Sequence, residues 1–133
     1  MKLLKNNFIS YIQNKKFGIY YLPARYQYVI LRDYYKRFNQ IFILPQGEPV
    51  FSSKNIKLRS LINKLNSSNE LVVLSIYVLP TNLKLREEIL RILVKKKIKT
   101  HFIFENLVAK GKKQYSYVSN IIKLNKFVNL KMS

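Results

Sequence analysis

Apolar and polar positions follow a regular order between residues 71 and 104. Residues 71–79 are apolar except for Ser75, which predicts a buried strand that is too short to cross a membrane. Leu85, Ile89 and Leu93 then recur at helical spacing and predict a helix over residues 82–96. Residues 98–104 alternate as in a half-buried strand. We therefore predict a strand, helix, strand unit with two parallel strands, either adjacent or separated by one other strand.

The C-terminal pattern predicts one further strand. Residues 106–114 lie around Gly111 and predict a hairpin connection. Tyr115 and Tyr117 alternate with polar residues, so residues 114–118 are expected to add a third strand to the sheet. Leu124, Phe127 and Leu130 allow a last short helix. The predicted fold class is α+β, with a ferredoxin-like βαβ-β core in which one helix packs on a small sheet.

The N-terminal half has a less regular pattern. Apolar positions within residues 1–17 recur at roughly helical spacing and predict a basic amphipathic helix. Residues 19–40 fit a strand in part and a helix in part, and both remain open. Residues 41–44 predict a short extended piece, residues 45–49 a turn rich in proline and glycine, and residues 54–65 a helix. We expect a basic, aromatic-rich extension at residues 1–53, which wraps neighbouring protein or RNA, and an α/β domain at residues 54–133.

Charge narrows the choice of partner. The chain of 133 residues has 25 Lys and Arg against 6 Asp and Glu, a net charge of +19, and no acid follows Glu105. So large an excess repels itself unless a polyanion neutralises it. With 48% hydrophobic residues the chain is not a disordered basic tail. The basic residues are spread along the chain rather than gathered on one amphipathic helix, which favours nucleic acid over a membrane surface.

The sequence has no arrangement typical of an enzyme. There is no cysteine, and the only histidine, His101, is expected at the surface or facing RNA. Glu87 and Glu88 are adjacent, so on a helix they point about 100° apart and cannot flank one substrate atom. The glycines are isolated and form no phosphate-binding pattern. We expect no enzymatic activity, no cofactor or metal, no small-molecule substrate and no membrane insertion.

Basic residues interleaved with aromatic ones are the candidates for RNA contact, because lysine and arginine neutralise phosphates and tyrosine stacks on unpaired bases. The predicted RNA-binding residues are Arg25, Arg32, Lys36, Arg37, Lys95, Lys96, Lys97, Lys99, Lys110, Lys112, Lys113, Tyr115, Lys123 and Lys126.

Composition also bears on origin. Phe, Tyr, Met, Ile, Asn and Lys, whose codons are AT-rich, make up about half of the chain. Such a bias is found in organelle genomes and in those of some parasites and endosymbionts, and a mitochondrial location is the expectation.

Two ribosomal protein families share parts of this organisation. Residues 72–77, 86–89 (REEI), 107–110 (LVAK) and 115–118 (YSYV) resemble the first strand, the helix, the hairpin and the third strand of the tenth small-subunit protein. A helix at residues 54–65, then strand, helix, strand and 106–110 (NLVAK) is similar to the tenth large-subunit protein, at the stalk base.

Net charge, size, AT-rich composition and the lack of an active site, together with these resemblances, lead us to expect a structural, rRNA-binding constituent of a mitochondrial ribosome. Its expected partners are rRNA and neighbouring ribosomal proteins. The small subunit is the first choice. The alternatives are a large-subunit protein at the stalk base and an accessory subunit of a respiratory membrane complex that is held by protein contacts.

Overall fold

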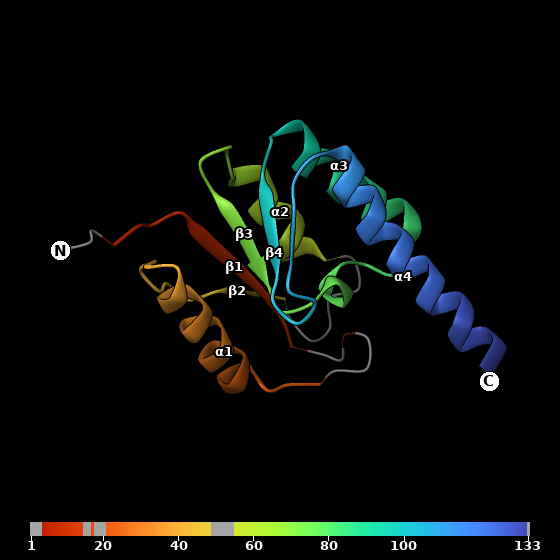
Figure 1. Ribbon diagram of the computed structural model, residues 1–133, viewed down its shortest axis with the longest axis horizontal. Coiled ribbons are helices and arrows are strands. Elements are labelled where there is room, and N and C mark those ends of the chain that lie inside the picture. Colours follow the sequence, from red (N-terminus) through yellow and green to blue (C-terminus); the bar gives the residue numbers. More distant parts are fainter. Residues whose placement is uncertain (1–3, 15–16, 18–20, 49–54, 133) are drawn as a thin grey trace.

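A five-stranded mixed sheet forms the centre of the fold (Figure 1). The computed structural model describes residues 4–14, 17, 21–48 and 55–132, with side chains up to residue 125. The strand order is β2-β1-β3-β4-β5. The first four strands in this order are parallel, and β5 is antiparallel to β4. The strands are β1 (Phe8–Gln13), β2 (Gln46–Glu48), β3 (Glu70–Val73), β4 (Lys99–Phe102) and β5 (Leu107–Ala109). The α+β class is confirmed, whereas a ferredoxin-like core is not confirmed by this strand order.

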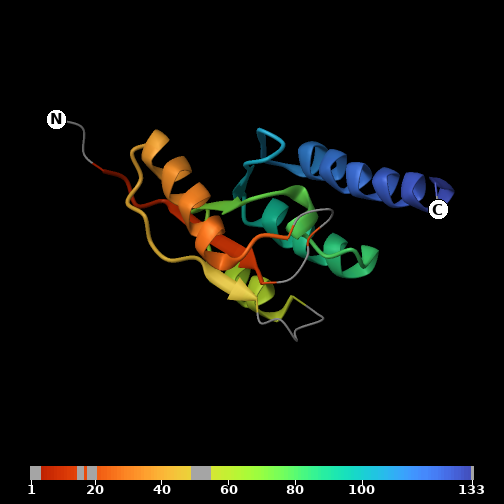
Figure 2. The same cartoon turned by 90° about the horizontal axis from the view of Figure 1, so that it is seen from below.

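The helices divide between the two faces of the sheet. They are α1 (Ala24–Arg37), α2 (Ile56–Lys64), α3 (Leu83–Lys95) and α4 (Lys112–Met132). Successive residues of β4 show the division, because Thr100 and His101 must point to opposite faces. The Thr100 hydroxyl lies 2.7 Å from the Tyr115 hydroxyl on α4, and His101 Nδ1 lies 2.6 Å from the Tyr34 hydroxyl on α1. Figure 2 shows α1 on one side of the sheet and the other helices on the opposite side.

Strand β1 corrects the predicted N-terminal helix. Residues 8–13 pair with β2 on one side and with β3 on the other, and all of them except Ile9 are buried. A strand covered on both faces shows no alternation, so its apolar residues fell by chance at helical spacing. The extension predicted at residues 1–53 thus contributes a central strand, and its Tyr11, Tyr34 and Tyr35 belong to the core.

The long strand predicted at residues 71–79 is shorter in the structure. Strand β3 ends at Val73, and the chain turns into a short 3-10 helix, η1 (Ile76–Val78). The Glu105 carboxylate accepts hydrogen bonds from the Ser75 hydroxyl, at 2.7 Å, and from the Ile76 amide, at 3.0 Å. Ser75, the one polar residue in the apolar run, therefore lies in the turn between the end of the strand and η1.

The predicted unit around α3 is confirmed. Helix α3 occupies residues 83–95, and the Asn82 side chain accepts a hydrogen bond from the Leu85 amide at its start. Strands β3 and β4 are parallel neighbours. Helix α2 confirms the helix predicted at residues 54–65.

Two expectations elsewhere are wrong. Residues 114–118 form the start of α4 rather than a strand: Tyr115, Val118 and Ile122 are buried at helical spacing, whereas Tyr117 is 61% exposed. Gln46–Glu48, expected in a turn, pairs with β1 as β2, and residues 41–44 form no helix or strand. Residues 24–37, left open by the sequence, form α1.

Candidate nucleic-acid interface

The fold gathers lysines at one edge of the sheet, where β4 begins and β5 ends. Thr100 pairs with Ala109, so continuing the register by one residue places Lys99 beside Lys110. The end of α3 and the start of α4 meet the same edge, at the top of Figure 1. We call this surface the cationic edge. It comprises Lys95, Lys97, Lys99, Lys110, Lys112 and Lys113.

Few acids compensate the cationic edge. Lys99 lies 3.9 Å from the Glu70 carboxylate, which also accepts a hydrogen bond from His101 Nε2 at 2.8 Å. In the described part of the chain the other lysines of the edge form no ion pair. Two unit charges about 5 Å apart in water repel by roughly 0.8 kcal/mol. A bound polyanion removes this repulsion and releases counterions.

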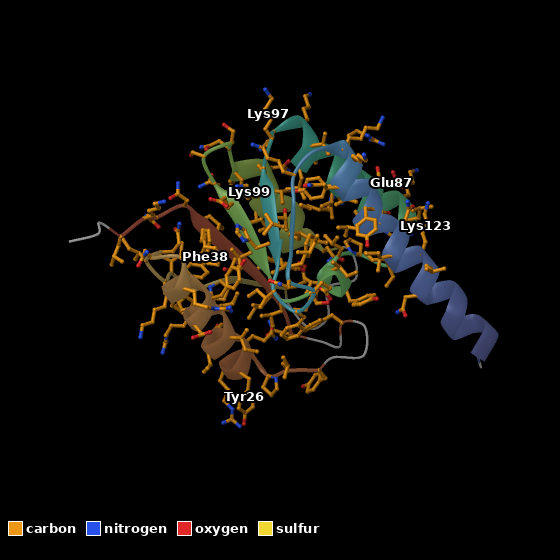
Figure 3. All side chains as sticks on the ribbon, in the orientation of Figure 1. Tyr26, Phe38, Glu87, Lys97, Lys99 and Lys123 are labelled. Carbon is orange, nitrogen blue, oxygen red and sulfur yellow. The ribbon has the colours of Figure 1, made fainter. Side chains whose placement is uncertain are left out.

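Lys97 occupies a backbone position that favours glycine. Its φ is +60°, and it follows α3 in a Schellman arrangement, with its amide donating to the Val94 carbonyl at 3.1 Å and the Ile98 amide to the Leu93 carbonyl at 3.0 Å. A left-handed conformation costs a residue with a side chain roughly 1–2 kcal/mol. The turn thus holds a lysine at the edge where glycine fits the backbone better (Figure 3).

Lys96 is not part of this surface, in contrast to the sequence prediction. Its ammonium donates to the carbonyls of Ile62 at 2.8 Å, Asn63 at 2.6 Å and Leu65 at 3.0 Å. These carbonyls end α2, where a helix carries partial negative charge and unpaired acceptors. Lys96 therefore joins the end of α3 to the end of α2 and serves the fold.

The predicted basic residues of α1 lie apart from the cationic edge, on the exposed side of that helix. Arg25, Arg32 and Lys36 share one stripe, because their spacing of seven and four residues returns to the same helical face. The guanidinium of Arg25 lies 4.9 Å from the centre of the Tyr26 ring. Arg37 pairs with Asp33 at 3.4 Å. The stripe is a second basic surface.

Tyr115 and His101 are buried, and this corrects their predicted surface roles. Tyr115 is 1% exposed, and its hydroxyl donates to the Ile98 carbonyl at 2.6 Å. Burial raises the pKa of Tyr115, which keeps the hydroxyl neutral. His101 is 4% exposed and packs among aromatic rings. Neither side chain is accessible to RNA.

The last two predicted residues lie on α4. Lys123 is exposed near the middle of that helix (Figure 3), away from the cationic edge. Lys126 lies outside the described side chains.

Sequence reasoning missed Phe38 and Val108, which are exposed on the face of the sheet that carries α1. Phe38 is 46% exposed and Val108 is 39% exposed. Apolar residues at a helix end and on a short strand are ordinary core candidates. No pattern in the sequence indicated that this part of the sheet would lack a covering helix.

The described residues contain no group of His, Cys, Asp and Glu that could hold a metal ion, and no helix among them has the length and apolar character needed to cross a bilayer. A groove of about 330 Å³ between α3 and α4 is lined by both Glu87 and Arg91, so it lacks the single charge sign of the cationic edge.

No protein-family model matches the chain, and no curated protein matches it with significance.

Proposed function

We propose that the protein is a structural constituent of a mitochondrial ribosome that binds rRNA through its cationic edge. The observation that carries the proposal is that these lysines from α3, β4, β5 and α4 gather at one edge. Among the described residues the one acid paired with them is Glu70. Phosphate backbones supply the matching charge at close spacing, and backbone contacts need no sequence-specific side chains. The strained Lys97 supports the proposal, because strained backbone positions are concentrated at functional sites.

The position within the ribosome has two candidates. The small subunit is the first expectation from the sequence, but residues 115–118, which resemble a third strand of that family, lie in α4. A large-subunit place at the stalk base is the second candidate. The large-subunit placement is supported by the order of elements, which is α2, β3, α3, β4 and then the NLVAK segment. The tenth large-subunit family likewise has a helix before its first strand.

Sucrose-gradient fractionation of organelle lysate that contains the tagged full chain tests this proposal. We expect the chain to sediment with one ribosomal subunit and to be released as the salt concentration rises. Its presence in the small-subunit or the large-subunit fraction decides between the two placements. Sedimentation with detergent-solubilised membrane complexes would contradict the proposal and favour the respiratory accessory subunit.

A further inference from the structure

Part of one face of the sheet has no covering helix in the described part of the chain. On this face α1 packs on β1, with Tyr34 and Tyr35 reaching Phe8. The coverage ends at His101 on β4, whose ring lies 5.5 Å from that of Tyr34. Beyond it lies β5, which no described helix covers on this side.

Alternation along the strands shows which residues occupy the uncovered area. Val108 pairs with His101 and so shares its face. Lys99 lies two residues from His101 on the same strand, with a side chain that is 43% exposed, and Lys110 lies beside it in the continued register. Phe38 closes the area at the end of α1. We call this surface the open face, and define it as Phe38, Lys99, Val108 and Lys110.

Phe38 is held in place although it is exposed. Its ring centre lies 4.8 Å from that of Tyr34, 5.7 Å from that of Phe8 and 5.8 Å from that of His101. These contacts restrict the rotation of the ring, although Phe38 stays 46% exposed. The rest of the ring is available to a planar partner at little cost in conformational entropy.

The open face has the chemistry of a site for unpaired nucleotides. A fixed aromatic ring and an aliphatic side chain form its floor, and lysines stand where a phosphate backbone would pass. Figure 3 shows Phe38 and Lys99 on the side of the sheet that carries α1, with Lys97 at the edge above them. The one nearby acid, Glu70, is engaged by His101 and Lys99. A second copy of this chain would bring its own net charge of +19 and is disfavoured by repulsion.

We propose that the open face binds an unpaired segment of RNA, with a base stacked on Phe38 and phosphates at Lys99 and Lys110. This inference rests on the proposed function and adds to it the kind of RNA that is bound. A duplex keeps its bases stacked on one another and offers none to Phe38, whereas a loop or bulge offers them freely. Stacking of this kind tolerates any base sequence.

The chain has no tryptophan, so one introduced residue gives an unambiguous fluorescence signal. We would make Val108→Trp on the open face and, as the matched control, Leu124→Trp at an exposed position on α4. The full chain is titrated with a short oligouridylate and with an RNA duplex of equal length. We expect the oligouridylate to quench Val108→Trp strongly and Leu124→Trp weakly, and the duplex to quench neither strongly.

A second set of variants keeps the inference testable if tryptophan perturbs β5. Phe38→Leu retains an apolar contact with Tyr34 but removes the stacking surface, and we expect it to weaken oligouridylate binding about tenfold. Lys99→Gln with Lys110→Gln should weaken it further. The control, Lys57→Gln with Lys84→Gln, removes the same charge from the amino ends of α2 and α3 and should have little effect. Melting curves confirm that each variant is folded.

The outcomes separate the two proposals. If the wild-type chain binds RNA but Phe38→Leu binds oligouridylate normally, or Val108→Trp is quenched no more than Leu124→Trp, the open face is not the site and the proposed function stands. Equal or tighter binding of the duplex also overturns the inference. If the chain binds neither RNA, or prefers vesicles of anionic lipid at the same salt concentration, the proposed function fails as well.

Discussion

Lys96 is expected to stabilise the fold rather than to bind RNA, and Lys96→Met tests this. Methionine keeps the aliphatic length but removes an ammonium that donates to the carbonyls of Ile62, Asn63 and Leu65. A hydrogen bond from a charged donor contributes roughly 1.5–3 kcal/mol, and a cation at a helix C-terminus adds about 0.3–1 kcal/mol. Water can replace the donor at the exposed Asn63 carbonyl. We therefore expect a loss of about 2 kcal/mol in the free energy of unfolding.

The adjacent residues provide matched controls, because Lys95→Met and Lys97→Met remove the same charge from the same turn. Neither of these lysines is hydrogen-bonded to α2 in the way Lys96 is, so their variants should change the unfolding free energy by no more than about 0.5 kcal/mol. The measurement is chemical denaturation of the three variants together with RNA affinity at fixed salt. Equal stability of all three, or a loss of RNA affinity confined to Lys96→Met, would refute the assignment.

Three further predictions concern stability. Arg86 is buried, and its guanidinium donates to Ser119 Oγ at 3.0 Å and to the Pro80 carbonyl at 3.0 Å. The single ammonium of Arg86→Lys cannot reach both acceptors, so chemical denaturation should show a loss of roughly 2 kcal/mol in the free energy of unfolding. Gly111 has φ +86° and open space around it, so Gly111→Ala should cost about 1 kcal/mol through backbone strain alone. Burial raises the pKa of Tyr35 to about 12. The folded state therefore holds a proton that the unfolded state loses above about pH 10, and stability is full below that pH and falls between pH 10 and 12. Tyr35→Phe should reduce this alkaline loss of unfolding free energy by about 2–3 kcal/mol. If the unfolding free energy of Tyr35→Phe fell with pH as steeply as that of the wild type between pH 10 and 12, the role of Tyr35 would be contradicted.

The segment around α3 could be predicted because its signals are local. Leu85, Ile89 and Leu93 repeat along one helical face, and Asn82 caps the start of the helix. Strand β1 could not be predicted in this way, because both its faces are buried by elements from elsewhere in the chain. The alternation of Tyr115 and Tyr117 was also misleading, because contacts with distant parts of the chain decide which of the two is buried. Only the contact of Tyr115 with Thr100, a tertiary interaction, shows which residues face the core.

The candidate site was predicted in part. Charge alone identified the lysines of the cationic edge, but no sequence pattern could show that β5 brings Lys110 beside Lys99. In the sequence Lys96 cannot be told from the lysines on either side of it. Only the fold places the carbonyl groups at the end of α2 within hydrogen-bond distance of its ammonium. His101 looked like a surface residue because it follows lysines on an alternating strand, yet α1 covers it.

The salt dependence of RNA affinity tests the central claim most directly. For a single-stranded RNA, the slope of log affinity against log salt concentration falls by roughly 0.7 for each phosphate neutralised. Lys110→Gln with Lys112→Gln should therefore make the slope of the full chain shallower by about 1.4, while the control Lys57→Gln with Lys84→Gln leaves it unchanged. If both double variants changed the slope equally, or neither did, RNA would not be held by the cationic edge.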